Sequence, residues 1–325
     1  MKYHEGEWFA VVNPHAGSGK TMSQWEKAKT VLIKAGIKFD FALTDCKYHA
    51  TKLTSKASKS GYRKFIAVGG DGTIHEVLAG VMSFVNKNPE STLSDFTLAV
   101  IPIGSGNDWI KTHSIPRKPE RIAELIVNNS FVKQDIVKVT VYDEAVKPYS
   151  RILNEAYMIN VGGVAFDARV CRRVNLRKEQ GKSGKLHYLR ALIATVFKYK
   201  PAPLKIVCDN EVLFEGDCLS VGMGIGKYSG GGMRQTPDAI VDDGLLELTI
   251  IPKLSYLRIA IEARRLFTGS IKKAKGLLFA QGKKIVVLPG NNTVSEPVEV
   301  DGEIVGVAPA VFEVLPDQIN VLSGN

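Results

Sequence analysis

The residues best suited to chemistry are three glycines and an aspartate that follow an apolar run. Phe65 to Val68 are apolar and partly β-branched, which is typical of a buried parallel strand, and Gly69-Gly70-Asp71-Gly72-Thr73 come before a helical pattern. Glycines let a phosphate approach backbone N–H groups, and the N-terminus of the next helix favours the same negative charge. A carboxylate beside phosphates repels them unless a divalent cation lies between. The stretch therefore predicts a phosphate-binding turn with Mg²⁺ at Asp71.

Two more glycine-bearing turns follow apolar strands. The first, Asn13 to Thr21, resembles a Walker A loop but has Pro14 where the first required glycine belongs, so a phosphate turn and a plain strand-to-helix connection both remain open. The second, Gly104-Ser105-Gly106-Asn107-Asp108, has Trp109 in place of the third glycine of a dinucleotide fingerprint. A nicotinamide-cofactor oxidoreductase is accordingly disfavoured.

The elements that must position these turns change character near Asp135. Before it, apolar runs alternate with helical patterns, predicting strands at Glu7–Val12, Ile37–Leu43, Lys64–Val68 and Thr97–Ile101 and helices at Thr21–Ala35 and Glu120–Asn128. In an open parallel sheet the turns at the carboxyl ends of the strands converge on one crevice. After it, short strands dominate, among them Glu155–Val161, Glu211–Glu215 and Cys218–Val221, and helical patterns occur only at Lys185–Lys198 and Leu254–Phe267.

These patterns predict an α/β N-terminal domain with a doubly wound, mostly parallel sheet, followed by an all-β, sandwich-like C-terminal domain. The expected domains are 1–134 and 135–311, with the option that the tail, about 312–325, returns to the first. A length of 325 residues and 45% apolar residues suit two domains with sizeable cores. No apolar run reaches the length of a bilayer span, and no leader is apparent, so we expect a cytoplasmic protein.

The cysteine spacing argues against a metal site, and the net charge indicates which classes of partner the protein binds. Cys46, Cys171, Cys208 and Cys218 have no metal-ligand spacing and are expected to be reduced core thiols. The net charge of +10 and pI of about 9.3 indicate anionic partners such as a nucleotide, a nucleic acid or an acidic membrane. The basic stretches lack interleaved aromatics, so a nucleic acid is not expected.

The ordered set of motifs resembles the diacylglycerol kinase catalytic-domain family, in particular bacterial soluble lipid kinases of the diacylglycerol and sphingosine kinase type, which are related to NAD kinases. The resemblance rests on the three turns above and on motifs in the second half: Asn160-Val161-Gly162-Gly163, Gly230-Gly231-Gly232, Pro237-Asp238-Ala239, Asp242-Asp243-Gly244 and Val300-Asp301-Gly302-Glu303. It implies ATP-dependent phosphoryl transfer to a lipid hydroxyl, with the active site in the cleft between the domains.

The resemblance also implies roles for residues. Glu303 matches the family's general base, and Asp71, Asp108 and Asp135 match its acidic cluster around the catalytic Mg²⁺. Asp243 with the carbonyls of Ile240 and Leu245 matches a second, structural Mg²⁺ site. The matching nucleotide contacts are Asn13, Thr44, Gly69, Gly70, Asp71, Gly72, Thr73, Ile74, His75, Gly104, Ser105, Gly106 and Asn107.

Several of these residues have a simpler interpretation. Thr44 could cap the helix that begins near His49, and Asp108 could cap one that begins at Trp109. Asp135 could face solvent before a strand, and Glu303 could be a solvated residue of a hairpin.

Two segments are basic, Arg169–Arg190 and Arg264–Lys284. Each also has apolar residues, such as Leu186, Tyr188 and Leu189 in the first and Leu266, Phe267 and Leu277 in the second. They predict a peripheral face for an anionic membrane, with solvated helix faces as the alternative. An NAD kinase-like phosphotransferase and a catalytically silent membrane or nucleotide sensor are the competing functions. The sequence is compatible with diacylglycerol, a sphingoid or ceramide-type lipid, or phosphatidylglycerol as the acceptor. It is also compatible with a homodimer.

Overall fold

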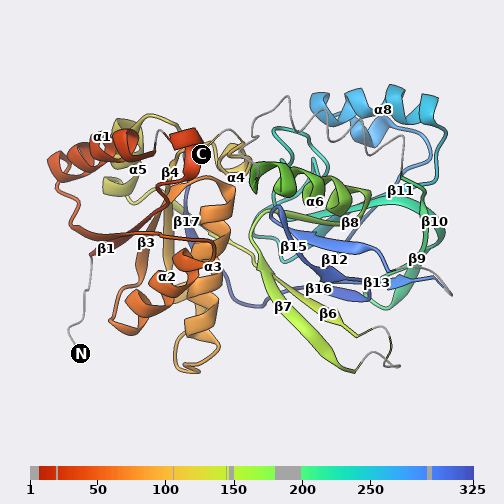
Figure 1. The fold of residues 1–325 in the computed structure, drawn as a ribbon, viewed down its shortest axis with the longest axis horizontal. Coiled ribbons are helices and arrows are strands. Elements are labelled where there is room, and N and C mark those ends of the chain that lie inside the picture. The colour runs from red at the N-terminus through yellow and green to blue at the C-terminus, as the bar shows by residue number, and fades with distance from the viewer. Residues whose placement is uncertain are drawn as a thin grey trace. The chain divides into compact units, whose positions relative to one another are not determined.

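The computed structural model describes residues 7–19, 21–104, 106–143, 145, 150–179, 199–290 and 295–325 (Figure 1). The chain forms two compact units. Unit 1 comprises Met1–Asp135 and Pro316–Asn325, and unit 2 comprises Ile136–Leu315. The C-terminal residues of unit 1 form a strand of its sheet, so the chain starts and ends in the same unit.

Unit 1 is built on a six-stranded sheet with the order β2-β1-β3-β4-β17-β5. The first five strands are parallel and only β5 is antiparallel, paired with β17. The strands are β1 (Trp8–Val12), β2 (Phe39–Leu43), β3 (Lys64–Gly69), β4 (Thr97–Pro102), β5 (Phe131–Gln134) and β17 (Ile319–Leu322). β1, β3 and β4 are almost fully buried, as expected for strands covered on both faces.

Two pairs of helices cover this sheet: α1 (Thr21–Lys34) contacts α5 (Pro119–Val127), and α2 (His49–Lys59) contacts α3 (Asp71–Val85) (Figure 1). The chain leaves β1 toward β2 and then returns to β3 on the other side of β1. The strand order therefore reverses between β1 and β3, where doubly wound sheets bind ligands at the carboxyl ends of their strands. Asn13 and Gly70 follow these two strands directly.

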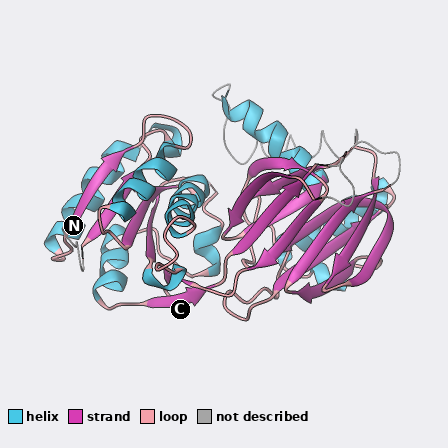
Figure 2. Cartoon of the chain, turned by 90° about the horizontal axis from the view of Figure 1, so that it is seen from below, coloured by secondary structure: helices cyan, strands magenta, loops and turns pink. Residues whose placement is uncertain are grey.

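Unit 2 is built mainly of strands, drawn in magenta in Figure 2. They form an antiparallel sheet with the order β15-β14-β8-β10-β9-β13-β16-β6-β7, and β11 and β12 are added beside β10. Asn154 Nδ2 on β7 donates to the carbonyl oxygen of Val305 on β15 over 2.8 Å, so the two end strands meet and the sheet curls toward a barrel. The strands are β6 (Val137–Tyr142), β7 (Ile152–Met158), β8 (Val161–Ala165), β9 (Ala202–Cys208), β10 (Glu211–Gly224), β11 (Leu246–Pro252), β12 (Leu278–Gly282), β13 (Lys284–Pro289), β14 (Pro297–Val300), β15 (Glu303–Val307) and β16 (Ala310–Val314).

The core of unit 2 consists of buried apolar residues from most strands, such as Val139, Ile206 and Phe312. Helix α6 (Phe166–Glu179) contributes Phe166 and Val170 to this core. Helix α8 (Tyr256–Thr268) packs at its edge. The two units together confirm the predicted fold class, a parallel α/β sheet followed by an antiparallel β-sandwich.

The structure corrects several predicted elements. The strand expected at Glu155–Val161 is two strands, β7 and β8, and those expected at Glu211–Glu215 and Cys218–Val221 are one long strand, β10. Helix α6 was not predicted, because its arginines and other polar residues interrupt the apolar pattern. The helix expected at Lys185–Lys198 lies outside the described residues.

The expectation of core thiols is right for Cys208 and Cys218, whereas Cys46 is exposed and Cys171 is half-buried. All four are free thiols. Burial raises the pKa of the Cys218 thiol to about 12, which keeps it protonated and unreactive. No helix in the described part of the chain is long and apolar enough to cross a bilayer.

Candidate functional site

The turn after β3 is held tightly against the end of β1. The backbone N–H of Asn13 donates to Val68 over 3.0 Å, and Asn13 Nδ2 donates to Thr73 Oγ1 over 3.3 Å. A Cβ on Gly69 would lie 2.2 Å from Thr73 Oγ1, so only glycine fits there. Helix α3 starts at Asp71 without a side-chain cap at Gly70. The amides of its first turn are those that a helix cannot satisfy itself, which makes this end suited to an anion.

The turn after β4 comes directly against the turn after β3. A Cβ on Gly104 would lie 3.2 Å from Cα of Gly70 and 2.8 Å from Oδ1 of Asn107, so the backbones approach too closely for a side chain. Asn107, at φ 49°, donates Nδ2 to the carbonyl oxygen of Gly104 over 3.1 Å. Arg117 Nη1 donates to the same oxygen over 3.4 Å. Ser105 lies outside the described residues.

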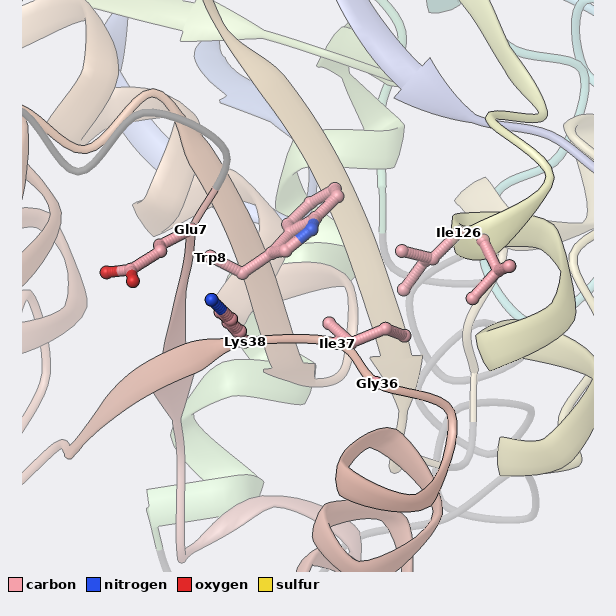
Figure 3. A pocket seen from close by; sticks show the side chains of 7 residues that line it. Glu7, Trp8, Gly36, Ile37, Lys38 and Ile126 are labelled. Atoms are coloured by element: carbon pink, nitrogen blue, oxygen red, sulfur yellow. The ribbon is translucent and has the colours of Figure 1, made fainter.

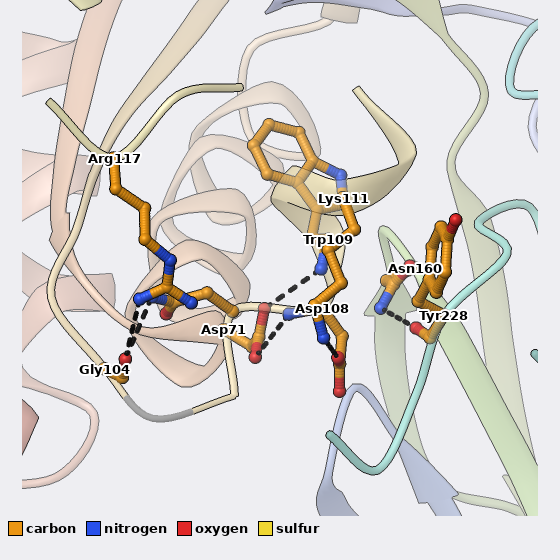
Figure 4. Close-up of polar contacts among 9 residues, drawn as sticks. Asp71, Gly104, Asp108, Trp109, Lys111, Arg117, Asn160 and Tyr228 are labelled. Carbon is orange, nitrogen blue, oxygen red and sulfur yellow. Dashed lines mark hydrogen bonds and ion pairs between the residues drawn. The ribbon is translucent and has the colours of Figure 1, made fainter. Parts of the chain in front are cut away.

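Asp71 joins these two turns (Figure 4). Its Oδ2 accepts the backbone N–H of Asp108 over 3.1 Å, and its Oδ1 accepts that of Trp109 over 3.2 Å. The Asp108 carboxylate does not cap the short helix α4 (Trp109–Thr112) and instead pairs with Lys111 Nζ at 2.5 Å. One carboxylate therefore fastens the start of α3 to the start of α4.

The other acidic residues of the predicted cluster have different surroundings. Asp135 is only 2% exposed, and its Oδ1 accepts Gln318 Nε2 over 2.7 Å, so it does not face solvent. Within the described ranges, no group of three or more His, Cys, Asp or Glu side chains is placed to hold a metal ion. The structure thus ties Asp71 to the backbone of Asp108 but does not gather Asp71, Asp108 and Asp135 into a metal-binding cluster.

The remaining predicted nucleotide contacts in unit 1 are largely buried. Thr44 is 5% exposed and follows β2, with its N–H donated to Val12 over 2.9 Å. It does not cap α2: the carboxylate of Glu76 accepts the N–H groups of Tyr48 and Ala50 there. Thr73, Ile74 and His75 are buried in the first turns of α3, while Gly72 is exposed and no atom lies within 4 Å of a Cβ built on it.

In unit 2, Glu303 follows a two-residue hairpin turn between β14 and β15. Asp301 and Gly302 have φ values of 51° and 89°, and Val300 pairs with Glu303, the pattern of a tight turn that favours Asp-Gly. The Asp301 carboxylate accepts the N–H groups of Ile159 and Asn160 over 3.0 and 2.9 Å. The half-buried Glu303 is therefore carried by a fixed turn.

The peptide groups of Gly302 are held from two directions. Its N–H donates to Glu299 Oε2 over 2.9 Å, and its carbonyl oxygen accepts Asn175 Nδ2 over 2.8 Å and the Cys171 thiol over 2.9 Å. Burial raises the pKa of Glu299 well above its ordinary value. The sequence did not single out Glu299 or Asn175, and it indicated Cys171 only as a core thiol. The i, i+4 spacing of Cys171 and Asn175 would have indicated a shared helix face, but not its target.

The residues of the predicted second metal site lie in an exposed turn of unit 2. Asp243 Oδ1 accepts the N–H of Leu245 over 3.0 Å, Gly244 has a φ of 73°, and the side chain of Ile240 is 52% exposed. The Asp243 carboxylate is thus folded back onto its own turn. A single carboxylate with backbone oxygens beside it is a donor set that a hard cation accepts.

A pocket of about 380 Å³ lies near the amino ends of strands β1 and β2 of unit 1 (Figure 3). It is lined by Trp8 at the start of β1, Ile37 and Lys38 before β2, and Ile126 in α5. Because the glycine turns follow the carboxyl ends of the strands, this pocket is separate from them. It is not part of the candidate site.

Comparison with known proteins places the chain in a family. Residues 7–139 match the diacylglycerol kinase catalytic domain, and residues 160–323 match the YegS C-terminal NAD kinase beta sandwich-like domain. A protein of Xanthomonas campestris pv. campestris named probable lipid kinase YegS-like is 27% identical over 248 residues, 76% of this chain and 74% of that protein. A Mycobacterium tuberculosis protein named diacylglycerol kinase is 25% identical over 328 residues, 99% of this chain and 97% of that protein.

The fold agrees with a solved structure of a diacylglycerol kinase from Bacillus anthracis str. Sterne. The TM-score is 0.73 at 23% identity, covering 100% of this chain and 98% of that one. This chain therefore belongs to the YegS-like and diacylglycerol kinase family of lipid kinases, whose two characteristic domains it carries in order.

Proposed function

We propose that the protein is an ATP-dependent lipid kinase that transfers the γ-phosphoryl group to a hydroxyl of diacylglycerol or a related lipid. The observation that carries the proposal is the fastening of two glycine turns by Asp71 at the carboxyl ends of parallel strands. Such turns offer backbone amides without covering side chains. Phosphoryl transfer depends mainly on positioning and charge neutralisation, which amides and a cation supply.

The residues around Asp71 fit a nucleotide with Mg²⁺. A carboxylate oxygen has two lone pairs, so an oxygen that accepts one amide can still coordinate a hard cation. The cation would neutralise phosphate charge beside the Asp71 and Asp108 carboxylates. Arg117, which reaches the Gly104 carbonyl, and Lys111, beside Asp108, add positive charge to the same turn. Asp135 would contribute through Gln318 and the end of β5 rather than as a direct ligand.

In unit 2, Glu303 would act as the general base that accepts the proton of the lipid hydroxyl. The fixed Asp301-Gly302 turn supports this role, because a base must be held within hydrogen-bond reach of its proton. The turn with Ile240, Asp243 and Leu245 would hold a second Mg²⁺ through one carboxylate and two backbone oxygens. That ion would stabilise the turn and take no part in the transfer.

The test is phosphorylation with γ-labelled ATP and Mg²⁺, offered in parallel with diacylglycerol, sphingoid or ceramide-type lipids, phosphatidylglycerol and NAD. We expect label in an organic-extractable lipid, lost in Asp71→Ala and strongly reduced in Glu303→Gln. Glu313→Gln is the matched control, because Glu313 is an exposed glutamate of β16 whose carboxylate pairs with Lys284 Nζ at 3.5 Å.

The competing function is phosphorylation of NAD, which the NAD kinase beta sandwich-like character of the second domain favours. Label that appears only in NADP would replace the lipid with NAD as acceptor. No label in any acceptor, with nucleotide binding retained, would indicate a catalytically silent protein. The lipid that incorporates most label identifies the acceptor.

A lipid acceptor also implies contact with a membrane. We propose a cytoplasmic enzyme that binds an anionic membrane surface peripherally, in keeping with the net charge of +10. No nucleic-acid partner is proposed.

A further inference from the structure

Helix α8 of unit 2 carries apolar side chains that point away from the protein. Leu257, Ile261 and Phe267 are 74%, 56% and 53% exposed. Leu257 and Ile261 are four residues apart and share one side of the helix. At about 100° per residue, Phe267 lies about 80° around the helix from Leu257, on the side away from Ile261. Figure 1 shows α8 at the outside of unit 2. The helix thus presents a raised apolar stripe to solvent.

The opposite side of α8 already anchors it. Ile259 packs against the main core of unit 2, and Leu266 packs on a small cluster formed by Ile271, Ala274 and Leu277. Leu266 and Leu277 were expected to contact a membrane, but both pack inward in this cluster. The outward residues Leu257 and Ile261 are therefore not required for packing of the helix.

The charges around the stripe are positive. Arg264 is exposed one turn after Ile261, and Lys273 and Lys275 are exposed just beyond the helix; among the described residues none of the three forms an ion pair. Arg258 Nη2 donates to the carbonyl oxygen of Lys275 over 2.6 Å and keeps this lysine beside the helix. The single acid of α8, Glu262, has a side chain only 14% exposed and pairs with Arg265.

The inner side of α8 is also connected to the turn that carries Glu303. The backbone N–H of Arg234 donates to Leu266 over 2.7 Å, and its guanidinium lies 5.1 Å from the ring centroid of Tyr228. The carbonyl oxygen of Tyr228 accepts Asn160 Nδ2 over 2.9 Å, and the N–H of Asn160 donates to Asp301. A continuous path of direct contacts thus joins α8 to the Asp301-Gly302 turn within unit 2.

We propose that Leu257, Ile261 and Phe267, with Arg264, Lys273 and Lys275 around them, form a docking face for an anionic lipid bilayer. The apolar side chains enter the headgroup layer while the cations remain among the lipid phosphates. This inference rests on the proposed function, since it concerns how a lipid acceptor is reached. A second copy of the chain fits less well, because a symmetric contact would bring the two positive faces together.

The test uses the full chain in co-sedimentation with vesicles of phosphatidylcholine, with and without phosphatidylglycerol. We expect binding that requires phosphatidylglycerol and weakens with salt. The variant Leu257→Gln/Ile261→Gln should bind the vesicles at least about tenfold more weakly than the wild type, because it removes the inserted apolar area. Circular dichroism spectra and melting temperatures verify that it folds.

The matched control is Ile152→Gln/Leu153→Gln on β7. These residues are 51% and 55% exposed, but the charges near them are neutralised in the ion pairs Arg151–Asp143 and Lys138–Glu155. This control should bind vesicles as the wild type does. Equal loss of binding in both double variants, or binding of the wild type that needs no anionic lipid, would overturn the docking face.

Failure of the docking face and failure of the proposed function give different results. With a short-chain acceptor in detergent micelles, the α8 variant should retain wild-type kinase activity, and only its activity on vesicles should fall. A wild type that sediments with vesicles but labels no lipid would refute the kinase and leave the docking face standing. A variant that sediments normally but loses an oligomer in light scattering would reassign α8 to a contact between copies.

Discussion

Asn175→Ala tests whether the clamp on Gly302 matters for the reaction rather than only for folding. The variant removes the 2.8 Å hydrogen bond from Nδ2 to the Gly302 carbonyl oxygen, while the Cys171 thiol remains 2.9 Å from the same oxygen. The carbonyl keeps a partner, so the free energy of unfolding should fall by only about 1 kcal/mol. Glu299 still holds the N–H side of Gly302.

The effect on the rate should exceed the effect on stability. Glu303 is the next residue, and a displacement of a catalytic group by about 1 Å can lower a rate by up to about a hundredfold. Because two of the three contacts on Gly302 remain, we expect kcat to fall by about tenfold. KM for ATP should not change, since Asn175 belongs to the unit that does not carry the glycine turns.

Asn154→Ala is the matched control. Asn154 also donates Nδ2 over 2.8 Å to a backbone carbonyl, that of Val305, on the strand that starts at Glu303. Its loss should cost the same stability and leave kcat near that of the wild type. Steady-state kinetics and urea unfolding of both variants provide the comparison. Equal losses of kcat in the two variants would refute the positioning role of Asn175.

Three further predictions concern unit 1. Asp71→Ala removes two amide contacts and should lower the free energy of unfolding by about 2 kcal/mol in urea denaturation, besides abolishing lipid labelling. Gly104→Ala should cost about 1–3 kcal/mol by the same measurement and weaken ATP binding, whereas Gly72→Ala, which meets no atom within 4 Å, should keep its stability. Burial lowers the pKa of His113 to about 4, so its contribution to stability is complete above about pH 6.5 and is lost as the pH falls toward 4, with a slope of up to about 1.4 kcal/mol per pH unit that His113→Asn should abolish.

The fold was largely predictable because the two halves of the chain have different periodicities. Phe65 to Val68 and Leu98 to Ile101 are unbroken apolar runs, as strands covered on both faces require. The long β10 was harder to recognise, since Gly216 and Asp217 interrupt its apolar pattern like a turn. In the structure they remain in the strand because β9 pairs with them along its length.

The candidate site was predictable where it consists of turns and not where it consists of tertiary contacts. The positions of the glycines indicate the turns, and the close approach of Gly104 to Gly70 and Asn107 explains why position 104 must be glycine. The partners of Glu299 and Asn175 depend on which strand and helix face one another, and a single sequence does not contain that information. Asp135 resembled a surface residue because Gln318, its partner, lies 183 positions away.

Asp71 and Asp301 make the same pattern of hydrogen bonds, which affects how their variants can be interpreted. Each carboxylate accepts the N–H groups of two consecutive residues, Asp108 and Trp109 in one case and Ile159 and Asn160 in the other. Loss of activity in Asp71→Ala would therefore not identify a metal ligand, because the same change releases the turn.

Asp301→Ala supplies the missing comparison, since it breaks an equivalent pair of contacts in the unit without the glycine turns. Both variants should lose similar stability in urea, but only Asp71→Ala should raise the Mg²⁺ concentration needed for half-maximal nucleotide binding, measured by calorimetry without turnover. If the two variants respond to Mg²⁺ alike, then Asp71 acts through the geometry of its turn, and the cation must be held by other groups.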